Sequence, residues 1–243
     1  MKAAFDSSGE VLVVTGGAQG IGAAIARAFA EAGGSCVVLD IAEPEAELAR
    51  TPRVQVMRCD VADRDALCSC IDAAIRDHGR IDGLVAAAAV QPRLRLADTD
   101  PDDWQRVIDV NLNGAVWACQ AVLPAMTAAR RGSIVLFGSG LGATVRAEAA
   151  AYAATKAAMV ALAKSLAAET AADGVRVNVL FPGVIDTEQF RRANPGAERE
   201  FWQRTTGIGQ PADVVGPLLF LLSDAATMTG SVLSRDRAFG QTT

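Results

Sequence analysis

Short runs of continuous apolar residues constrain the fold of this chain more than any other feature. Runs of this length that are rich in β-branched residues and end at turn residues are typical of strands buried on both faces of a sheet. Each strand is expected to be followed by a helix, as in residues 21–34, which have helical spacing of apolar residues and end in two glycines. Buried strands that alternate with helices predict an α/β fold, a doubly wound and mostly parallel sheet with helices on both faces. The predicted strands cover residues 10–17, 35–40, 54–61, 83–88, 132–139, 175–183 and about 230–234.

The longer helices are predicted from their periodicity and their end signals. His78 and Gly79 close one helix, because a histidine suits the negative end of the helix dipole and glycine adopts the left-handed stop. No linker-like stretch interrupts the chain between about residues 10 and 235, so residues 1–243 are expected to form a single domain. The predicted helices cover residues 63–79, 101–129 with Thr99 or Asp100 as N-cap, 151–171 and 214–224.

The composition excludes several classes of partner. The net charge of -5 and the pI near 5.0 argue against nucleic acid, because binding to the phosphate backbone needs a basic face. No apolar run approaches the roughly 18 residues that span a bilayer, and the start MKAAFDSSGE lacks the apolar core of a signal peptide. We therefore expect a cytoplasmic protein with no membrane partner. The five cysteines lack paired CxxC spacing and are expected to be reduced core residues, with no metal site.

A glycine-rich turn joins the first predicted strand to the first helix. In TGGAQGIG (15–22), Gly16, Gly20 and Gly22 let the backbone turn tightly and approach a pyrophosphate, which the helix N-terminus attracts. Asp40 ends the second strand, where a carboxylate accepts hydrogen bonds from the adenosine ribose and repels the 2′-phosphate of NADP. Ile41 follows it in place of an arginine that could bind this phosphate. The sequence therefore favours NAD over NADP as the cofactor.

Further motifs, in order along nearly the whole chain, resemble the short-chain dehydrogenase/reductase family of single-domain Rossmann-fold enzymes. Asp60-Val61 resembles its adenine-contacting pair, VNLNG its helix asparagine, and PGVIDT its nicotinamide-side motif. Ser139 resembles its active-site serine, and Tyr152 with Lys156 its YxxxK motif. The resemblance implies that the catalytic residues are Asn111, Ser139, Tyr152 and Lys156. It implies that the cofactor-binding residues are Gly16, Gln19, Gly20, Ile21, Gly22, Asp40, Ile41, Asp60, Val61, Ala87, Ala88, Tyr152, Lys156, Pro182, Gly183, Ile185 and Thr187.

The motif AYAATK places Tyr152, the single tyrosine of the chain, one helical turn before Lys156. Residues four apart on a helix are neighbours, so the lysine ammonium acts on the phenol. A phenol titrates near 10, and a shift of roughly 2 to 3 units would make it a base near neutral pH. One nearby cation supplies part of that shift, and the positive charge of an oxidised nicotinamide could add to it.

The family resemblance implies a division of labour in this predicted site. Tyr152 exchanges the proton of the substrate hydroxyl, and Lys156 tunes it and holds the nicotinamide ribose. Ser139 polarises the substrate oxygen. Asn111 positions a water that links Lys156 to solvent. The implied activity is NAD-dependent interconversion of a secondary alcohol and a ketone, in a homotetramer.

The chain departs from the family pattern at two places. Ala86-Ala87-Ala88-Ala89 stands where the family usually has Asn-Asn-Ala-Gly, which predicts weaker cofactor binding or a shifted sheet edge. The end SRDRAFGQTT replaces the usual Asp-Gly-Gly close, and its Arg235 and Arg237 either form intersubunit pairs or are solvated. These departures leave open an alternative function, a non-catalytic dinucleotide-binding regulatory protein. A second alternative, among enzymes, is an NADP-dependent carbonyl reductase.

The segment expected to contact the substrate is the one whose structure is hardest to predict from the sequence. Residues 186–210 are expected to form a lid over the substrate, and they mix aromatic residues with arginines. Such a lid permits an anionic or ring-bearing alcohol, although a solvated position is the more common one for any single arginine. Arg146, shortly after Ser139, is a better candidate for contact with a substrate carboxylate.

Overall fold

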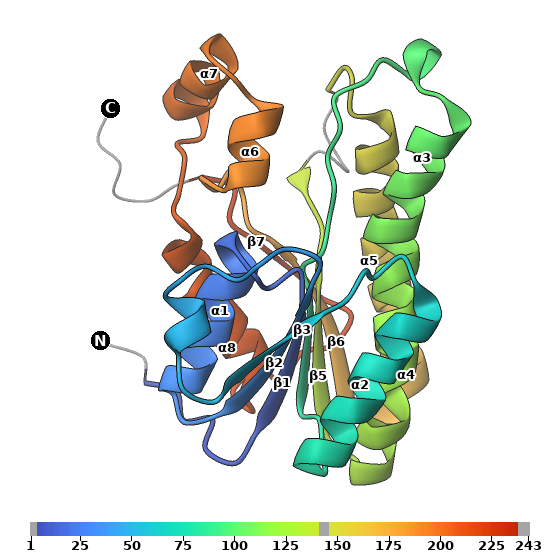
Figure 1. The fold of residues 1–243 in the computed structure, drawn as a ribbon, viewed down its shortest axis with the longest axis vertical. Coiled ribbons are helices and arrows are strands. Elements are labelled where there is room, and N and C mark those ends of the chain that lie inside the picture. The colour runs from blue at the N-terminus through green and yellow to red at the C-terminus, as the bar shows by residue number, and fades with distance from the viewer. Residues whose placement is uncertain (1–3, 141–145, 238–243) are drawn as a thin grey trace.

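A parallel sheet of seven strands organises the computed structural model, which describes residues 4–140 and 146–237 (Figure 1). The strand order is β3-β2-β1-β4-β5-β6-β7, and every neighbouring pair is parallel. The order reverses between β1 and β4, and in open α/β sheets ligands bind beyond the carboxyl ends of the strands at such a point. The strands are β1 (Val11–Thr15), β2 (Ser35–Asp40), β3 (Val54–Arg58), β4 (Gly83–Ala86), β5 (Gly132–Phe137), β6 (Val175–Phe181) and β7 (Val232–Ser234).

Helices cover both faces of the sheet, so the fold class is the predicted doubly wound α/β arrangement (Figure 1). One face carries α1 and α8, and the other carries α2, α4 and α5 (Figure 1). The α-helices are α1 (Gly20–Glu31), α2 (Arg64–His78), α3 (Pro101–Ile108), α4 (Gly114–Ala129), α5 (Ala150–Thr170), α6 (Glu188–Ala193), α7 (Ala197–Thr205) and α8 (Val215–Leu222). The tighter or wider turns are η1 (Leu48–Arg50), η2 (Leu96–Asp98), η3 (Asp109–Asn113), η5 (Ala171–Asp173) and η6 (Pro211–Val214).

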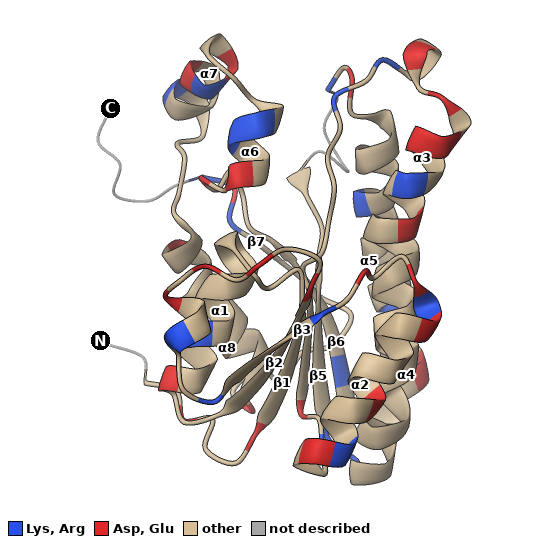
Figure 2. Cartoon of the chain, in the orientation of Figure 1, with Lys and Arg blue, Asp and Glu red and all other residues tan. Residues whose placement is uncertain are grey.

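The sheet separates two apolar cores. Successive residues of a strand point to opposite faces, so Val13 belongs to the core under α2, α4 and α5, whereas Leu12 and Val14 belong to the core under α1 and α8. Both faces are buried, which explains why the strands read as continuous apolar runs. The strands carry few charges, and acidic and basic residues lie mainly on the helices and loops (Figure 2).

The helix ends follow the predicted signals. Asp100 caps α3 by accepting a hydrogen bond from the Asp103 N–H at 2.8 Å, which decides between Thr99 and Asp100. Gly79 ends α2 with φ of 75°, as predicted for a left-handed stop. The five cysteines are free thiols. Cys36, Cys59 and Cys119 are buried, as expected for core residues, whereas Cys68 and Cys70 are only partly buried. Among the described residues, no helix combines the length and apolarity needed to cross a membrane.

Two connections differ from the prediction. The strands β2 and β3 are joined through the short turn η1 instead of a full helix, although each strand was expected to be followed by one. The helix expected over residues 101–129 is divided into α3 and α4 by η3, a π-helical turn. Hydrophobic periodicity does not reveal the π turn η3, because α3 and α4 on either side of it continue the same apolar face.

Candidate active site

A cleft of about 1210 Å³ lies at the carboxyl ends of the strands. Its walls come from the β1–α1 turn, the ends of β2, β4, β5 and β6, the start of α5, and helices α6 and α7. All of the residues predicted to bind the cofactor line this cleft, and so does Ser139. Asn111 is the one predicted site residue that does not line it, and it is buried.

The glycine-rich turn has little space for side chains. Gly16 has φ of 68°, and a Cβ there would lie 2.5 Å from the Ala88 Cα, so the turn packs directly on the chain after β4. A Cβ on Gly22 would lie 2.3 Å from the Gly16 carbonyl oxygen, which keeps the start of α1 close to the turn. Gly20 has φ of 60°, and a Cβ there would lie 3.2 Å from the Thr187 Cγ2 atom. These contacts explain why glycine occupies three positions of TGGAQGIG.

Two carboxylates border the predicted adenosine side of the cleft. The Asp40 oxygens accept hydrogen bonds from the Ala18 and Ala42 N–H groups, both at 2.9 Å. Those bonds hold the carboxylate in place at the end of β2, and each oxygen keeps a second lone pair for a ribose hydroxyl. The other carboxylate, Asp60, accepts from the Ala62 N–H at 2.9 Å and from Arg106 at 3.1 Å.

A carboxylate already binds at the amino end of α1. The Glu45 Oε1 atom accepts a hydrogen bond from the Gly20 N–H at 3.0 Å, and the Glu45 N–H donates to the Ala18 carbonyl at 2.9 Å. This carboxylate stands in for an oxygen of a pyrophosphate, because it uses a free N–H at the positive end of a helix. The glycine-rich turn and its neighbouring N–H groups therefore fit a dinucleotide.

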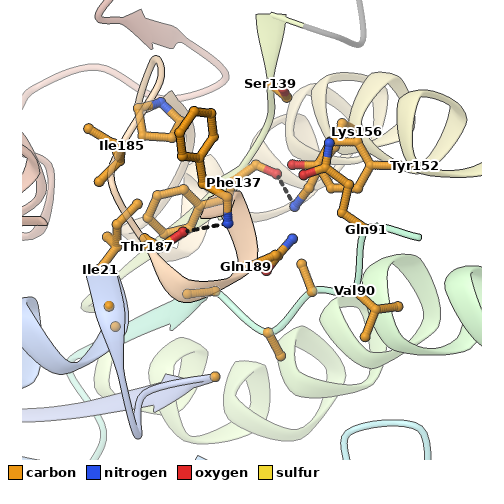
Figure 3. A pocket seen from close by; sticks show the side chains of 18 of the residues that line it. Ile21, Val90, Gln91, Phe137, Ser139, Tyr152, Lys156, Ile185, Thr187 and Gln189 are labelled. Carbon is orange, nitrogen blue, oxygen red and sulfur yellow. Dashed lines mark hydrogen bonds between the residues drawn. The ribbon is translucent and has the colours of Figure 1, made fainter. Parts of the chain in front are cut away.

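The other wall carries Ser139, Tyr152 and Lys156. Figure 3 shows Tyr152, Lys156 and Gln91 on one side of the cleft and Ile21, Ile185 and Thr187 on the other. Tyr152 and Lys156 lie on consecutive turns of α5, with the Lys156 ammonium 5.6 Å from the centre of the tyrosine ring. The ammonium donates a hydrogen bond to the Phe137 carbonyl at 3.0 Å, at the end of β5. This bond fixes the lysine beside the strand that leads to Ser139.

Burial dominates the electrostatics of this group. Burial raises the pKa of Tyr152 to about 12, and a hydrogen bond with Ser139 acts in the opposite direction. Burial lowers the pKa of Lys156 to about 8. Burial is therefore the larger effect in the chain alone, and the downward shift expected from Lys156 and a bound nicotinamide stays a prediction. Desolvation is the largest cause for both groups, and the ammonium lies over the ring and donates to the Phe137 carbonyl.

Asn111 uses its amide to shape the backbone beside the site. Its Oδ1 accepts from the Val90 N–H at 2.7 Å, and its Nδ2 donates to the Val90 carbonyl at 2.9 Å and to Thr155 at 3.3 Å. The amide thus holds the segment after β4 against α5, and η3 aims it there. These bonds give the side chain a structural role, and the predicted water relay to Lys156 stays a prediction.

The alanine run after β4 does not displace the sheet. Ala86 pairs with Thr15 of β1 and with Leu136 of β5 in regular register, and the Ala87 N–H donates to the Thr15 carbonyl at 3.0 Å. The expected alternative of a shifted sheet edge is wrong. The backbone bonds of the strand hold this register whatever the side chains, so weaker cofactor binding is the alternative that remains.

The carboxyl-terminal arginines differ in their surroundings. Arg235 makes an ion pair with Asp213 of η6 at 3.3 Å and lines the cleft. It is mostly buried and paired within the chain, so the expectation that it is solvated is wrong, and the intersubunit pair stays a prediction. Its carbonyl oxygen would lie 2.3 Å from a Cβ on Gly183, so the tail packs on the PGVIDT motif. Arg237 is exposed, and residues 238–243 of the altered tail lie outside the described part of the chain.

The segment expected to form a lid contains α6 and α7, which stand beyond the carboxyl ends of the strands (Figure 1). Arg146, after β5, donates to Asn194 at 2.8 Å and to Glu198 at 2.9 Å, and its guanidinium lies 5.1 Å from the centre of the Trp202 ring. Arg93, after β4, donates to the same Glu198 oxygen at 2.8 Å. Sequence reasoning missed Arg93, Asn194 and Glu198, because Arg93 lies 105 positions before Glu198 and none of the three belongs to a motif.

Comparison with known proteins identifies relatives over nearly the whole length. The family described as enoyl-(acyl carrier protein) reductase matches residues 16–238. The cis-4-hydroxycyclohexanecarboxylate dehydrogenase of Sinomonas cyclohexanicum is 37% identical over 238 residues, which cover 94% of this chain and 96% of that protein. The galactitol 2-dehydrogenase of Rhizobium johnstonii is 36% identical over 249 residues, covering 97% and 96%.

Solved structures agree with these relatives. A short-chain type dehydrogenase/reductase from Mycobacterium marinum superposes with a TM-score of 0.89 at 30% identity, and the match covers 96% of each chain.

Proposed function

The chain belongs to the short-chain dehydrogenase/reductase family, and within it we propose an NAD-dependent oxidoreductase that interconverts a secondary alcohol and a ketone. Membership shows that the protein is an oxidoreductase of this family. The single observation that carries the proposal is Tyr152, held between Ser139 and Lys156 on the cleft wall opposite the glycine-rich turn. The hydride would be supplied or accepted by a nicotinamide dinucleotide held there by these residues.

Tyr152 moves the proton in this proposal. With a pKa raised to about 12, the phenol is protonated at neutral pH and can donate its proton to the oxygen of a ketone as the carbonyl becomes an alcohol. In the opposite direction the phenolate oxygen accepts the proton of the alcohol. Oxidation of the alcohol therefore requires the phenolate form of Tyr152. The ammonium of Lys156, which lies beside the ring, is the cation that would stabilise this phenolate.

Ser139 and Lys156 prepare the site for this transfer. Ser139 lies just beyond the end of β5, where its hydroxyl can donate to the substrate oxygen that gains negative charge. Lys156 is anchored by the Phe137 carbonyl and is the residue that would hold the nicotinamide ribose. The glycine-rich turn, Asp40 and Asp60 would hold the adenosine and pyrophosphate end.

The preference for NAD rests on Asp40. Its carboxylate is fixed at the end of β2 by two backbone N–H groups, so it cannot easily turn away from a 2′-phosphate. Ile41 beside it is 52% exposed and offers no positive charge. A carboxylate that is fixed and already hydrogen-bonded favours two ribose hydroxyls over a phosphate dianion.

The relatives suggest alcohols of two kinds as substrates. The name of one relative gives a ring-bearing hydroxy acid, and the name of the other gives a neutral sugar alcohol. Both compounds carry secondary hydroxyl groups, which agrees with a proton-transfer site of this type.

The test of the proposal is oxidation of a panel of secondary alcohols by the purified protein with NAD or NADP, followed by NADH or NADPH absorbance. We expect turnover with NAD that Tyr152→Phe removes. Higher kcat/KM with NADP would support the carbonyl reductase alternative instead. Binding of NADH without turnover of any alcohol or ketone would support the regulatory alternative, which the alanines at 87–89 in the cleft wall favour. Homotetramer formation is a separate part of the proposal and is tested by light scattering.

A further inference from the structure

Arg146 is a partly buried cation in the wall of the cleft. Its side chain is 16% exposed, and it lines the cleft together with Asn194 and Trp202. The Asn194 Oδ1 atom accepts from Arg146 at 2.8 Å and from the Trp202 indole N–H at 3.1 Å, and Asn194 is itself 3% exposed. A buried amide therefore fixes both the guanidinium and the indole ring. This arrangement is a preorganised pair of a cation and an aromatic face.

The negative charge around Arg146 is shared with a second arginine. Glu198 accepts from Arg146 and from Arg93 through one oxygen atom, Oε2. Arg93 has in addition the carboxylate of Glu148 at 2.8 Å. Arg93 is thus paired with two acids, whereas Arg146 shares one acid with a neighbouring cation.

The titration of the two arginines reflects this difference. Burial lowers the pKa of Arg146, and repulsion from Arg93 lowers it further. Burial acts on Arg93 in the same direction, but its hydrogen bonds with Glu198 and Glu148 outweigh that effect and raise its pKa. Glu198 and Glu148 act on Arg146 in the opposite direction but do not outweigh burial and Arg93. A substrate carboxylate beside Arg146 would add a charged hydrogen-bond partner to a cation whose one bonded acid is shared with Arg93.

The position of Arg93 keeps the lid anchored if Arg146 takes another partner. Glu198 lies on α7 and remains bound to Arg93, which also donates to the Ala193 carbonyl of α6 at 3.1 Å. Arg93 does not line the cleft, so its contacts serve the packing of α6 and α7. The two arginines thus have separable roles, although they share one acid.

Resting on the proposed function, we propose that Arg146 binds a carboxylate of the substrate and that the substrates are hydroxy acids and their keto acids. The reacting carbon lies at Tyr152 and Ser139, whereas the guanidinium contacts α6 and α7, so the alcohol and the carboxylate belong at separate ends of the molecule. Trp202 beside the guanidinium offers an aromatic face to a ring or an aliphatic chain between them. A neutral polyol would leave the cation without this partner.

The test compares acids with their primary amides, which have nearly the same shape and no charge. The first pair is cis-4-hydroxycyclohexanecarboxylate and its amide, followed by open-chain and aromatic hydroxy acid pairs, all with NAD. We expect the wild type to favour at least one acid over its amide by about 30-fold in kcat/KM, as a charge-assisted hydrogen bond would provide. Arg146→Gln is expected to lower kcat/KM for that acid about 100-fold and for its amide less than about 3-fold. Arg146→Lys should keep part of the preference, because it keeps the charge and loses the fork geometry.

Arg93→Gln is the matched control, because it removes the other arginine bound to Glu198. If it loosens α7, kcat/KM should change for the acid and the amide alike, apart from a further loss for the acid smaller than that in Arg146→Gln, because Glu198 is then left to Arg146 alone. A wild type that prefers no acid, or an Arg146→Gln variant that loses both substrates equally, would overturn the inference while leaving the proposed function intact.

A second readout does not depend on turnover. Calorimetric titration of the wild type with cyclohexanecarboxylate and with cyclohexanecarboxamide, in the presence of NADH, should show the acid binding more tightly. Arg146→Gln should remove that difference, and its melting temperature shows whether the variant is folded. Equal binding of both compounds, repeated with the aromatic and open-chain pairs, would overturn the inference even if the protein turned over no alcohol.

Discussion

The two ends of the cleft are built in different ways. The proposed cofactor end is built from turns that directly follow strands. Its hydrogen bonds at Gly20 and around Asp40 are donated by backbone N–H groups. At the proposed substrate end, side chains distant in the sequence meet, and Glu198 binds partners 52 and 105 positions away. Backbone contacts depend on the fold itself, whereas side-chain contacts change with single substitutions. One end can therefore keep a cofactor while the other is altered for new substrates.

The largest effect should come from Tyr152→Phe, which separates chemistry from binding at either end. Loss of the phenolic proton is expected to lower kcat by about 10³-fold, within the range for general acid–base catalysis. NADH binding, measured by fluorescence titration, should stay within about 2-fold, because the ring and the cofactor end are unchanged. A variant that kept most of its turnover would rule out the proposed proton transfer.

The next effect concerns the stability of the protein and comes from Lys156, which lies in the cleft wall between the two ends. The pKa of Lys156 is about 8 in the folded chain against 10.5 in the unfolded one, so the unfolded state holds more protons between these values. The Lys156 contribution to the free energy of unfolding should therefore rise with pH above about 8, by roughly 1 to 2 kcal/mol at pH 9.5. Below pH 8 the cost of burying the ammonium is constant.

Urea unfolding of the wild type and of Lys156→Met at pH 7 and about pH 9.5 measures this term. The difference between the two proteins isolates it, because the buried thiols, whose raised pKa values lower the stability above about pH 9, contribute equally to both. A difference that does not change with pH would mean that Lys156 is neutral or well solvated.

A smaller effect is expected at Asp40, which tests the cofactor end alone. Asp40→Asn removes the charge and keeps the shape, so kcat/KM for NAD relative to NADP should fall about 10-fold. Discrimination between acid and amide substrates should not change, because Asp40 and Arg146 belong to opposite ends. A change in both properties would break the separation between the two ends.

The smallest effect is expected from Glu45→Gln, at the amino end of α1. The Glu45 carboxylate binds the Gly20 N–H that a pyrophosphate would use, so removal of its charge should lower the KM for NAD about 3-fold. Glu43→Gln is the control, since Glu43 also lines the cleft. Equal effects of both variants would indicate general electrostatics instead of competition at this N–H.

Much of the cofactor end could be predicted because its signals are local. The apolar runs, the glycine motif and the acids at the strand ends predicted a sheet and a cleft that the structure contains. The π turn at Asn111 and the short β2–β3 connection could not be predicted in the same way. The π turn depends on a wider local hydrogen-bond pattern. The β2–β3 connection depends on how short a segment can join two neighbouring parallel strands.

From the sequence alone, the parallel sheet, the place of Ser139 at a strand end and the neighbouring positions of Tyr152 and Lys156 on one helix could be predicted, because strand ends and helical spacing depend on neighbouring residues. Only the tertiary structure decided how these groups are charged and what surrounds them. Burial, which raises the pKa of Tyr152 and lowers that of Lys156, is a sum over many packed segments. The pairing of Arg146 with Glu198 and Asn194 likewise exists only after distant segments have folded together. Desolvation and long-range pairing are properties of the assembled core, and no short stretch of sequence encodes them.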